Sequence, residues 1–547
     1  MYKFKIEKIK FTNGEEFEPN KVNIIIGPNN SGKSKTLKEI ADIFYNVKDT
    51  KYIVKDINYN LPESYEEFYS SYNLEDKIME GGNYRTLRVY ANYEAKEVYL
   101  NLQNDDFYQK NIKSSNVFLK DFGRIFLNYL GTENRLTMIK KSEYVSDRFG
   151  RVNFLTDLYN TIKYSVSTIQ IELSKIVKKL FNREIVLDSS SVLGSLSFRV
   201  ASDFEYVREG KFQDSQIIKK LGAERVLDKE GYGLKSFVST YLSLKYNEKD
   251  IVLIDEPEAF LHPPLARQLG EIIGQSANEN RQIFVTTHSS EILKGILSTC
   301  TDVSVIRITR KEDSNEITIL EKEKLLEIIR TPKLRVSKIL EGLFCEKVIV
   351  TEAEADEIFY QEFLEKIQPQ SGVFFTHVNS KSNIVPTSLI YSALKVNNAM
   401  VFDFDVIRND NGEFKQILKS LNVNCIDITR YIQVSKNVDV YIDNLVDPKL
   451  DKEKRREEKG KFYHRKGMNC LSENLKNDVE EMIEELYKYN VFILKNGELE
   501  TNLQEFNVEY KNRKDIWISD AIDFLDSANK ENLENSKIGE FGGKLKK

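Results

Sequence analysis

Two groups of residues in this sequence have the types and the spacing that phosphate chemistry needs. The first is a glycine-rich loop near the N-terminus, made of Gly27, Pro28, Asn29, Asn30, Ser31, Gly32, Lys33 and Ser34. The second is a set of four carboxylates beyond the middle of the chain: Glu352, Asp356, Asp403 and Asp405. The loop predicts nucleotide binding, and the carboxylates predict a divalent-metal site suited to phosphodiester chemistry. A chain with both sites is expected to use a nucleotide to control cleavage of nucleic acid.

The glycine-rich loop lies in the context that a phosphate-binding loop requires. The apolar run of residues 22–26 predicts a buried parallel strand, and residues 35–44 have helical periodicity. Between them, backbone N–H groups of Gly32 to Ser34 would surround a β-phosphate at the positive end of the helix. The ammonium of Lys33 would reach the β- and γ-phosphates, and the hydroxyl of Ser34 would bind Mg²⁺.

Two later strands predict the rest of a nucleotide-hydrolysing site. An apolar run at residues 251–254 ends at Asp255 and Glu256, and another at residues 283–286 leads to His288. Asp255 is expected to hold Mg²⁺ through water, and Glu256 to polarise the attacking water. His288 would then sense the γ-phosphate, although a single histidine at a strand end is more often a core or capping residue.

These motifs resemble those of the ABC-type ATPases of the RecF, SMC and OLD group. The resemblance rests on three runs of the sequence, GPNNSGKS, LIDEPEAFLHP and TTHSSEIL. It implies that ATP is bound between two heads, with Glu256 as the catalytic carboxylate and His288 as the switch residue. It also implies a glycine-rich signature helix supplied by the partner head. Gly231 and Gly233 are the candidates for that helix, but their segment departs from the usual LSGGQ-like wording and could be a plain helix start.

The four carboxylates follow two apolar runs that predict neighbouring parallel strands. One run precedes Glu352 and Asp356, and the other, residues 399–402, precedes Asp403 and Asp405. Alternate residues of a strand share a face, so Asp403 and Asp405 can point the same way. Converging carboxylates repel one another unless a divalent cation neutralises them, and oxygen ligands suit Mg²⁺ or Mn²⁺. An acidic pair taken alone could equally be a solvated strand end.

The order of these carboxylates resembles the TOPRIM domain of topoisomerases, bacterial primases and OLD-family nucleases. The family has a Glu-Gly pair and a nearby Asp after one strand, then Asp-x-Asp after a later strand; here Ala353 replaces the glycine. OLD-type nucleases also carry a lysine after the Asp-x-Asp strand. Lys466 is the candidate, at the end of a basic stretch, residues 449–466, that could otherwise be a solvated helix. Glu500 lies in a segment similar to their C-terminal region and is a further candidate ligand.

The motif order predicts an α/β protein with two domains. We expect an ABC-type P-loop ATPase domain over residues 1–340, with a helical dimerisation or arm insertion at about residues 150–220. A TOPRIM domain with a Rossmann-like parallel sheet and a C-terminal extension would follow over residues 341–547. The insertion rests on apolar residues at helical spacing between residues 155 and 180, a stripe more typical of a core or dimer face than of a cofactor site. Residues 528–547 are rich in Asn, Lys, Glu and Gly and predict a disordered end.

Composition limits the classes of protein that remain. The chain has 547 residues, too many for one core, and a net charge of -5, so any nucleic-acid contact must come from a local basic patch. No apolar run reaches the roughly 20 residues that span a bilayer. The N-terminus carries no secretory segment, and the four cysteines are scattered without metal spacing. These features predict a cytoplasmic protein with no membrane partner.

The combined order of motifs resembles the OLD-family ATP-dependent endonucleases over nearly the whole chain. The resemblance implies an ATP-regulated, divalent-metal-dependent DNA endonuclease that is a homodimer or higher oligomer through its ATPase heads. It further implies a role in defence against phage, with or without an accessory defence protein. Two alternatives remain open. One is an ATP-driven DNA-binding switch with an inactive TOPRIM domain, as in RecF-like or SMC-like proteins, and the other is a toxin-like nuclease that acts on RNA such as tRNA.

Overall fold

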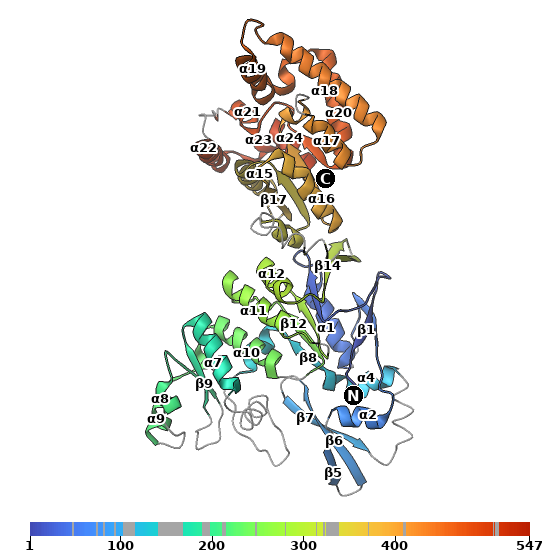
Figure 1. Ribbon diagram of the computed structural model, residues 1–547, viewed down its shortest axis with the longest axis vertical. Coiled ribbons are helices and arrows are strands. Elements are labelled where there is room, and N and C mark those ends of the chain that lie inside the picture. The colour runs from blue at the N-terminus through green and yellow to red at the C-terminus, as the bar shows by residue number, and fades with distance from the viewer. Residues whose placement is uncertain are drawn as a thin grey trace. The chain divides into compact units, whose positions relative to one another are not determined.

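The structure is a computed structural model that divides into two compact units, residues 1–322 and 323–547. Figure 1 colours the chain from blue at the N-terminus to red at the C-terminus. Each unit has its own sheets and its own hydrophobic core. The structure describes residues 1–45, 47, 49–72, 75–79, 82–91, 94–101, 115–139, 168–188, 197–209, 215–246, 249–278, 280–312, 314–320, 323, 326, 338–369, 371–408, 412–506, 508 and 514–546.

A six-stranded sheet organises the first unit, in the order β15-β14-β3-β13-β12-β8. Its strands are parallel except for β15, which pairs antiparallel with β14. The two central strands β3 and β13 are buried along their whole length, as the apolar runs of the sequence predict for a parallel sheet covered on both faces. The bounds are β3 (Val22–Ile26), β8 (Leu127–Leu130), β12 (Ile251–Asp255), β13 (Gln282–Thr286), β14 (Val303–Lys311) and β15 (Ser314–Leu320).

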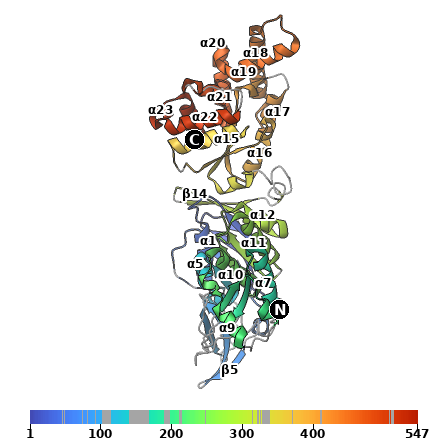
Figure 2. The same cartoon turned by 90° about the vertical axis from the view of Figure 1, so that its left-hand side faces the viewer.

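Helices pack on this sheet and lead away from its carboxyl edge. α1 (Lys33–Phe44) follows β3, α11 (Pro263–Gln275) follows β12, and α12 (Ser290–Thr299) follows β13. α11 and α12 lie side by side in Figures 1 and 2. A Cβ added at Gly295 would lie 2.3 Å from the carbonyl oxygen of Arg267, so glycine allows the two helices to approach this closely.

Smaller antiparallel sheets complete the first unit. β1 (Ile6–Phe11) pairs with both β2 (Glu16–Phe17) and β4 (Val54–Tyr59), and β6 (Gly82–Ala91) pairs with β5 (Glu75–Met79) and β7 (Glu94–Asn101). Aromatic rings from distant segments form the core beside β1, and Phe4 stacks on Phe126 with 4.4 Å between ring centroids. The helices of this region are α2 (Tyr65–Ser71), α4 (Ser115–Phe126) and α5 (Thr132–Thr137).

The predicted helical insertion is described only in part. Residues 155–167 of the apolar stripe lie outside the described residues. The rest of the stripe forms α7 (Thr168–Phe181), where Leu173 and Val177 are buried and which packs on β9 (Glu184–Asp188). This part of the stripe is therefore a packing face within the unit. The neighbouring elements are β10 (Ser197–Ala201), α8 (Glu205–Glu209), α9 (Ser215–Ala223), β11 (Arg225–Val226) and α10 (Tyr232–Tyr246).

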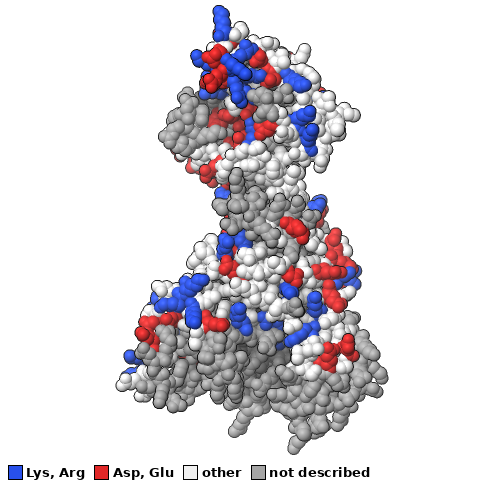
Figure 3. Space-filling view, viewed as in Figure 1, with Lys and Arg blue, Asp and Glu red and all other residues white. Residues whose placement is uncertain are grey.

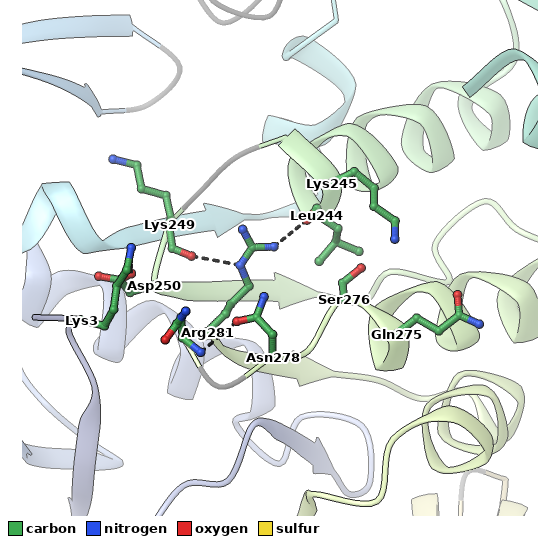
Figure 4. A pocket seen from close by; sticks show the side chains of 10 residues that line it. Lys3, Leu244, Lys245, Lys249, Asp250, Gln275, Ser276, Asn278 and Arg281 are labelled. Atoms are coloured by element: carbon green, nitrogen blue, oxygen red, sulfur yellow. Dashed lines mark hydrogen bonds and ion pairs between the residues drawn. The ribbon is translucent and has the colours of Figure 1, made fainter. Parts of the chain in front are cut away.

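A polar cavity of about 450 Å³ lies at the amino ends of β12 and β13, the edge of the sheet opposite to the glycine-rich loop. Figure 4 shows Arg281 at its centre, where its guanidinium donates to the carbonyls of Leu244 at 2.5 Å and Lys249 at 3.2 Å. Because Leu244 belongs to α10 and Arg281 precedes β13, these bonds join the end of that helix to the start of that strand. They give Arg281 a structural role.

A four-stranded parallel sheet organises the second unit, in the order β17-β16-β18-β19. The bounds of its strands are β16 (Lys347–Thr351), β17 (Val373–His377), β18 (Asn397–Phe402) and β19 (Val491–Ile493). Helices cover it, as Figure 2 shows for α22 and α23 beside α15. They are α15 (Glu354–Ile367), α16 (Lys381–Ala393), α17 (Glu413–Ser420), α18 (Cys425–Leu445), α19 (Lys452–Arg465), α20 (Glu473–Leu486), α21 (Leu499–Asn502) and α22 (Lys514–Ser527).

The prediction of a disordered C-terminal segment was wrong. Residues Lys530–Glu534 form α23 and Lys537–Lys546 form α24. Their apolar side chains Leu533 and Leu545 are buried in the core of the second unit. The carbonyl of Leu545 also accepts a hydrogen bond of 2.6 Å from Nζ of Lys347, the first residue of β16. Among the described helices of both units, none has the length and the apolar character that a membrane span needs.

Candidate functional sites at two sheet edges

The nucleotide motifs of the first unit meet at one edge of the six-stranded sheet. Gly27 follows β3, His288 comes shortly after β13, and Asp255 ends β12. These strands are parallel neighbours in the order β3-β13-β12, so their carboxyl ends lie together. The sheet thereby brings together the three motifs that the sequence separates.

Two glycines of the loop are required by its backbone. Gly27 has a φ of 144°, and an added Cβ would lie 2.0 Å from the carbonyl oxygen of Ile308. Gly32 has a φ of 98° and caps α1, which begins at Lys33. The first N–H groups of α1 therefore follow directly on the loop, as an anion site at a helix start needs.

Lys33 is buried within the loop, with 4% of its surface exposed. Its Nζ donates to the carbonyl oxygens of Gly27 at 3.0 Å and Pro28 at 2.7 Å. Burial lowers the pKa of Lys33 to about 8. Three carboxylates act on this pKa in the opposite direction: Glu256, Glu258 and Asp255. The ammonium is therefore close to the acidic residues that end β12.

The acidic pair at the end of β12 is held by residues of β13 and the segment after it. The carboxylate of Asp255 accepts a hydrogen bond from the Thr286 hydroxyl. The N–H of Glu256 donates to the carbonyl and the hydroxyl of Thr286 at 3.1 and 3.2 Å. Nε2 of His288 lies 3.2 Å from Oε1 of Glu256, and this contact lowers the pKa of Glu256. Glu256 is thus an ionised carboxylate, positioned to accept a proton from water.

Two residues of this site escaped the sequence analysis. Arg135, in α5, is fully buried and donates to the main-chain carbonyls of Asp255 at 2.5 Å and Glu256 at 2.9 Å. Oε1 of Glu258 accepts hydrogen bonds from the Thr287 hydroxyl at 2.8 Å and the His288 N–H at 2.6 Å. Glu258 stands in the motif run and could have been noticed. Arg135 carries no motif, and nothing in its surroundings signals a partner so far along the chain.

The two glycines proposed for a signature helix differ in their surroundings. Gly231 precedes α10, and a Cβ added to it would meet nothing within 4 Å. A Cβ added at Gly233 would lie 2.8 Å from the carbonyl oxygen of Phe260, in the turn after β12. Gly233 therefore has a packing reason within its own unit, whereas the packing of this unit gives none for Gly231.

The carboxylates of the second unit meet at the carboxyl edge of its parallel sheet. β16 and β18 are neighbours, with Val350 paired to Met400. Glu352 comes directly after β16, and Asp403 comes directly after β18. The structure therefore brings these two carboxylates to one edge from neighbouring strands. Asp356 lies in the first turn of α15, where its Oδ2 accepts a 3.0 Å hydrogen bond from the N–H of Ala353.

A buried tyrosine lies among these carboxylates. Tyr360 is one turn beyond Asp356 in α15 and is 2% exposed. Burial raises its pKa well above its usual range, and three carboxylates add to the effect: Asp356, Asp403 and Glu500. Their charges act on one phenol, so Glu500 of α21 approaches the same region as the predicted ligands.

Asp405 pairs with a lysine that the sequence analysis did not select. Asp405 lies in a short 3₁₀ turn (Phe404–Ile407), and its Oδ2 contacts Nζ of Lys381. Its other oxygen, Oδ1, is buried without a hydrogen-bond partner among the described residues. Burial works to lower the pKa of Lys381, but Asp405 and the more distant Glu352 outweigh it and raise the pKa overall.

The donor set fits a hard divalent cation, although its members are not gathered into a finished cage. Within the described part of the chain, no three His, Cys, Asp or Glu side chains group closely enough to hold a metal as they stand. The oxygen donors at the sheet edge and the buried Oδ1 of Asp405 are nevertheless the chemistry that Mg²⁺ or Mn²⁺ selects. The edge is therefore suited to a cation that draws the carboxylates together.

Lys466, the lysine expected from the resemblance, ends α19. Its Nζ lies 4.7 Å from the centroid of the Phe462 ring, and Lys381 is the lysine that contacts Asp405. Part of the basic stretch is engaged in ion pairs with α18, such as Arg455 with Asp443 at 2.8 Å. Figure 3 shows basic and acidic side chains mixed over this region. For these residues, helix packing accounts for the charge.

A second cavity, of about 440 Å³, lies between α19 and α21 and is lined by Lys461, His464, Arg465, Glu498, Glu500, Thr501 and Gln504. Nδ1 of His464 lies 2.6 Å from Oε1 of Glu498, and this contact raises the pKa of His464. Asp405 also acts on that pKa, so the cavity adjoins the carboxylate edge. A Cβ added at Gly497, whose φ is 101°, would lie 2.2 Å from the His464 carbonyl oxygen. Glycine therefore allows the close approach that forms the cavity wall.

Comparison with known families agrees with this geometry. A family model described as an AAA domain, putative AbiEii toxin, Type IV TA system, matches residues 22–294. A model described as an Overcoming lysogenization defect protein-like TOPRIM domain matches residues 343–405, which contain Glu352, Asp403 and Asp405. The chain is an OLD-type ATPase–TOPRIM fusion. The predicted fold class, a P-loop ATPase domain followed by a TOPRIM domain, is confirmed.

Curated relatives of this OLD-type chain are named as nucleases. The Old nuclease of Escherichia phage P2 is 26% identical over 168 residues, which cover 29% of this chain and 28% of the relative. Endonuclease GajA of Bacillus cereus (strain VD045) is 23% identical over 271 residues, covering 46% of this chain and 44% of the relative. The chain thus aligns with less than half the length of either relative.

Solved structures similar to the OLD-type chain include heads of SMC proteins. The SMC head domain from Thermotoga maritima is 14% identical, with a TM-score of 0.29, and the match covers 58% of this chain and all of that domain (100%). An SmcHead bound to the C-winged helix domain of ScpA is 13% identical, with a TM-score of 0.36, over 58% of this chain and 99% of that one. At these TM-scores the fold assignment rests on the sheet topology and the family matches.

Proposed function

We propose that this protein is an ATP-regulated, divalent-metal-dependent endonuclease that cuts DNA in the cytoplasm. The observation that carries the proposal is the pairing of β16 with β18, from whose carboxyl ends Glu352 and Asp403 follow. Hydrolysis of a phosphodiester by metal-activated water needs oxygen ligands from more than one segment, as at this edge. The names of the Old nuclease and of GajA support the same activity here.

In this proposal Glu352, Asp356, Asp403 and Asp405 hold Mg²⁺ or Mn²⁺. The cation, when bound, supplies an activated water and stabilises the leaving oxygen. The protein contributes the direction of the carboxylates, since Asp356 is oriented by the N–H of Ala353. Its basic residues would contact the phosphates of the substrate, with Lys466 and the cavity beside α19 as candidates.

At the other sheet edge, the loop from Gly27 to Ser34 would hold ATP. Lys33 would exchange its two carbonyl partners for phosphate oxygens, and Ser34 and Asp255 would hold the accompanying Mg²⁺. Glu256, kept ionised by His288, would take the proton from the attacking water. ATP would close a homodimer of heads through the segment of Gly231 and Gly233, and this closure would regulate cleavage.

A plasmid-nicking assay tests the proposal. Wild type, Asp403→Ala and Lys33→Ala are compared with Mg²⁺ or Mn²⁺, with and without ATP. Asp478→Ala is the matched control, because Asp478 is an exposed residue of α20. We expect nicking that needs the cation, that is lost in Asp403→Ala and that no longer responds to ATP in Lys33→Ala. Nicking by Asp403→Ala at the wild-type rate would remove the TOPRIM edge as the site.

Labelled RNA incubated under the same conditions separates the alternatives. Cleavage of RNA but not of DNA would favour the toxin-like nuclease, and ATP-dependent DNA binding without cleavage would favour the RecF-like switch. A role in phage defence, which the resemblance implies, is tested by plaque counts on cells that express wild type or Asp403→Ala. We expect protection by the wild type alone.

A further inference from the structure

Lys381 belongs to neither motif, yet its ammonium lies at the carboxylate edge of the second unit. It is the first residue of α16, shortly after β17, and β17 is the neighbour of β16. Its Nζ contacts Oδ2 of Asp405, and both side chains are 15% exposed. The charge of Glu352 also acts on this ammonium. A positive charge therefore already lies among the carboxylates proposed to hold a cation.

The position of Lys381 in its helix makes this arrangement unusual. The first turn of an α-helix carries the positive end of the helix dipole, which favours anions and disfavours cations. A lysine at the first position is therefore unfavourable for the helix alone. The partly buried pair with Asp405 offsets this cost. Residues that break a local rule in this way are found mainly at functional positions.

We propose that Lys381 is an internal counter-ion of the carboxylate site. Its ammonium neutralises Asp405 until a divalent cation displaces it, and it then contacts the phosphodiester of the substrate. The inference rests on the proposed function, because it assigns a role at the same site. Asp405 can serve both partners in turn, since its Oδ2 is taken by Lys381 while its Oδ1 is buried without a hydrogen-bond partner among the described residues.

The displaced ammonium has somewhere to go. Lysine carries its charge on a flexible four-carbon stem, so a small rotation moves Nζ while α16 stays in place. The cavity lined by Lys461, His464 and Arg465 adjoins this edge, because both Asp405 and Lys381 act on the charge of His464. A phosphate bound between the cavity and the cation would lie within reach of the lysine, which would stabilise the developing negative charge.

Binding of Mn²⁺, followed by its EPR signal without nucleotide or nucleic acid, tests the competition. Lys381→Met removes the charge, Lys381→Arg keeps it, and Lys419→Met on the surface of α17 is the matched control. We expect Lys381→Met to bind Mn²⁺ about tenfold more tightly, the scale of effects for groups that touch a metal ligand. Lys381→Arg and Lys419→Met should bind as the wild type does, and Asp403→Ala should lose the site. Lys381→Gln replaces the methionine variant if that variant does not fold.

Plasmid nicking at saturating Mn²⁺ supplies the second readout. We expect Lys381→Met to nick about 100-fold more slowly, although it binds the metal better, because a charge near the phosphate is lost. A purely structural role for Lys381 would weaken both metal binding and cleavage. Unchanged or weaker Mn²⁺ binding by Lys381→Met would overturn the inference. The proposed function would still stand if the wild type nicks and Asp403→Ala does not, and it fails if Asp403→Ala nicks normally.

Discussion

The imidazole of His288 lies 3.2 Å from the carboxylate of Glu256, measured from Nε2 to Oε1. The two residues come from the ends of neighbouring strands β13 and β12, so the pairing of the sheet fixes their contact. Glu256 also has a left-handed φ of 47°, a conformation that costs a residue with a side chain some stability. Strain of this kind persists where the surrounding structure holds it, and here the Thr286 and Arg135 bonds do so.

Glu256→Gln is expected to lower ATP hydrolysis at least about 100-fold, because the variant cannot take a proton from water. It should still bind ATP, since the loop and Lys33 are unchanged. Phosphate release measures hydrolysis, and light scattering after size-exclusion chromatography measures whether ATP now traps a dimer. Glu133→Gln, an exposed residue of α5, is the control. Wild-type hydrolysis by Glu256→Gln would assign the base to another residue.

ATP affinity is expected to fall as the pH rises above about 8. Burial lowers the pKa of Lys33 to about 8, so the free protein loses the ammonium above that pH. Phosphate binds the charged form, so binding must take up a proton, and the affinity should fall by up to about tenfold per pH unit. Isothermal titration calorimetry at pH 8.5 in two buffers of different ionisation enthalpy measures this uptake. Equal heats in both buffers would contradict the assignment.

Arg135→Met is expected to destabilise the ATPase unit and slow hydrolysis together. The buried guanidinium donates to the carbonyls of Asp255 and Glu256, and its loss leaves these carbonyls without that donor. Each unsatisfied buried group costs about 1–3 kcal/mol, so the free energy of unfolding should fall by about 2–5 kcal/mol. Urea unfolding and phosphate release are the measurements. Arg225→Met, at a side chain that is 80% exposed, should change neither.

The two signature candidates should respond differently to alanine. Gly233→Ala is expected to lower thermal stability, because its Cβ would meet the carbonyl oxygen of Phe260 at 2.8 Å. Gly231→Ala meets nothing within 4 Å and should leave stability unchanged. If Gly231 contacts the partner's nucleotide, the same variant should bind ATP normally as a monomer but dimerise less with ATP. Normal ATP-driven dimerisation by Gly231→Ala would remove it from the interface.

The sequence predicted the parts of this molecule in which chemistry follows directly on a buried strand. Runs such as residues 251–254 are apolar because both faces of a parallel sheet are covered, and the residues that follow them must lie at the carboxyl edge. The contact partners at that edge were harder to predict. Arg135 reaches Asp255, and Lys381 reaches Asp405, only because separate strands pair, and no local pattern records that pairing.

The wrong prediction for residues 528–547 has a physical reason as well. A polar composition suggested disorder, but composition ignores spacing. Leu533, Ile538 and Leu545 lie on the buried sides of α23 and α24, and a few well-placed apolar residues are enough to hold a helix on an existing core.

The bond from Lys347 to the carbonyl of Leu545 fastens α24 to the beginning of the strand that Glu352 follows. Anyone who shortens this protein for crystallisation should therefore spare its last helix. Trimming it would uncover apolar surface and leave the lysine at the root of β16 without that acceptor, so damage to the cutting edge would come from the far end of the sequence.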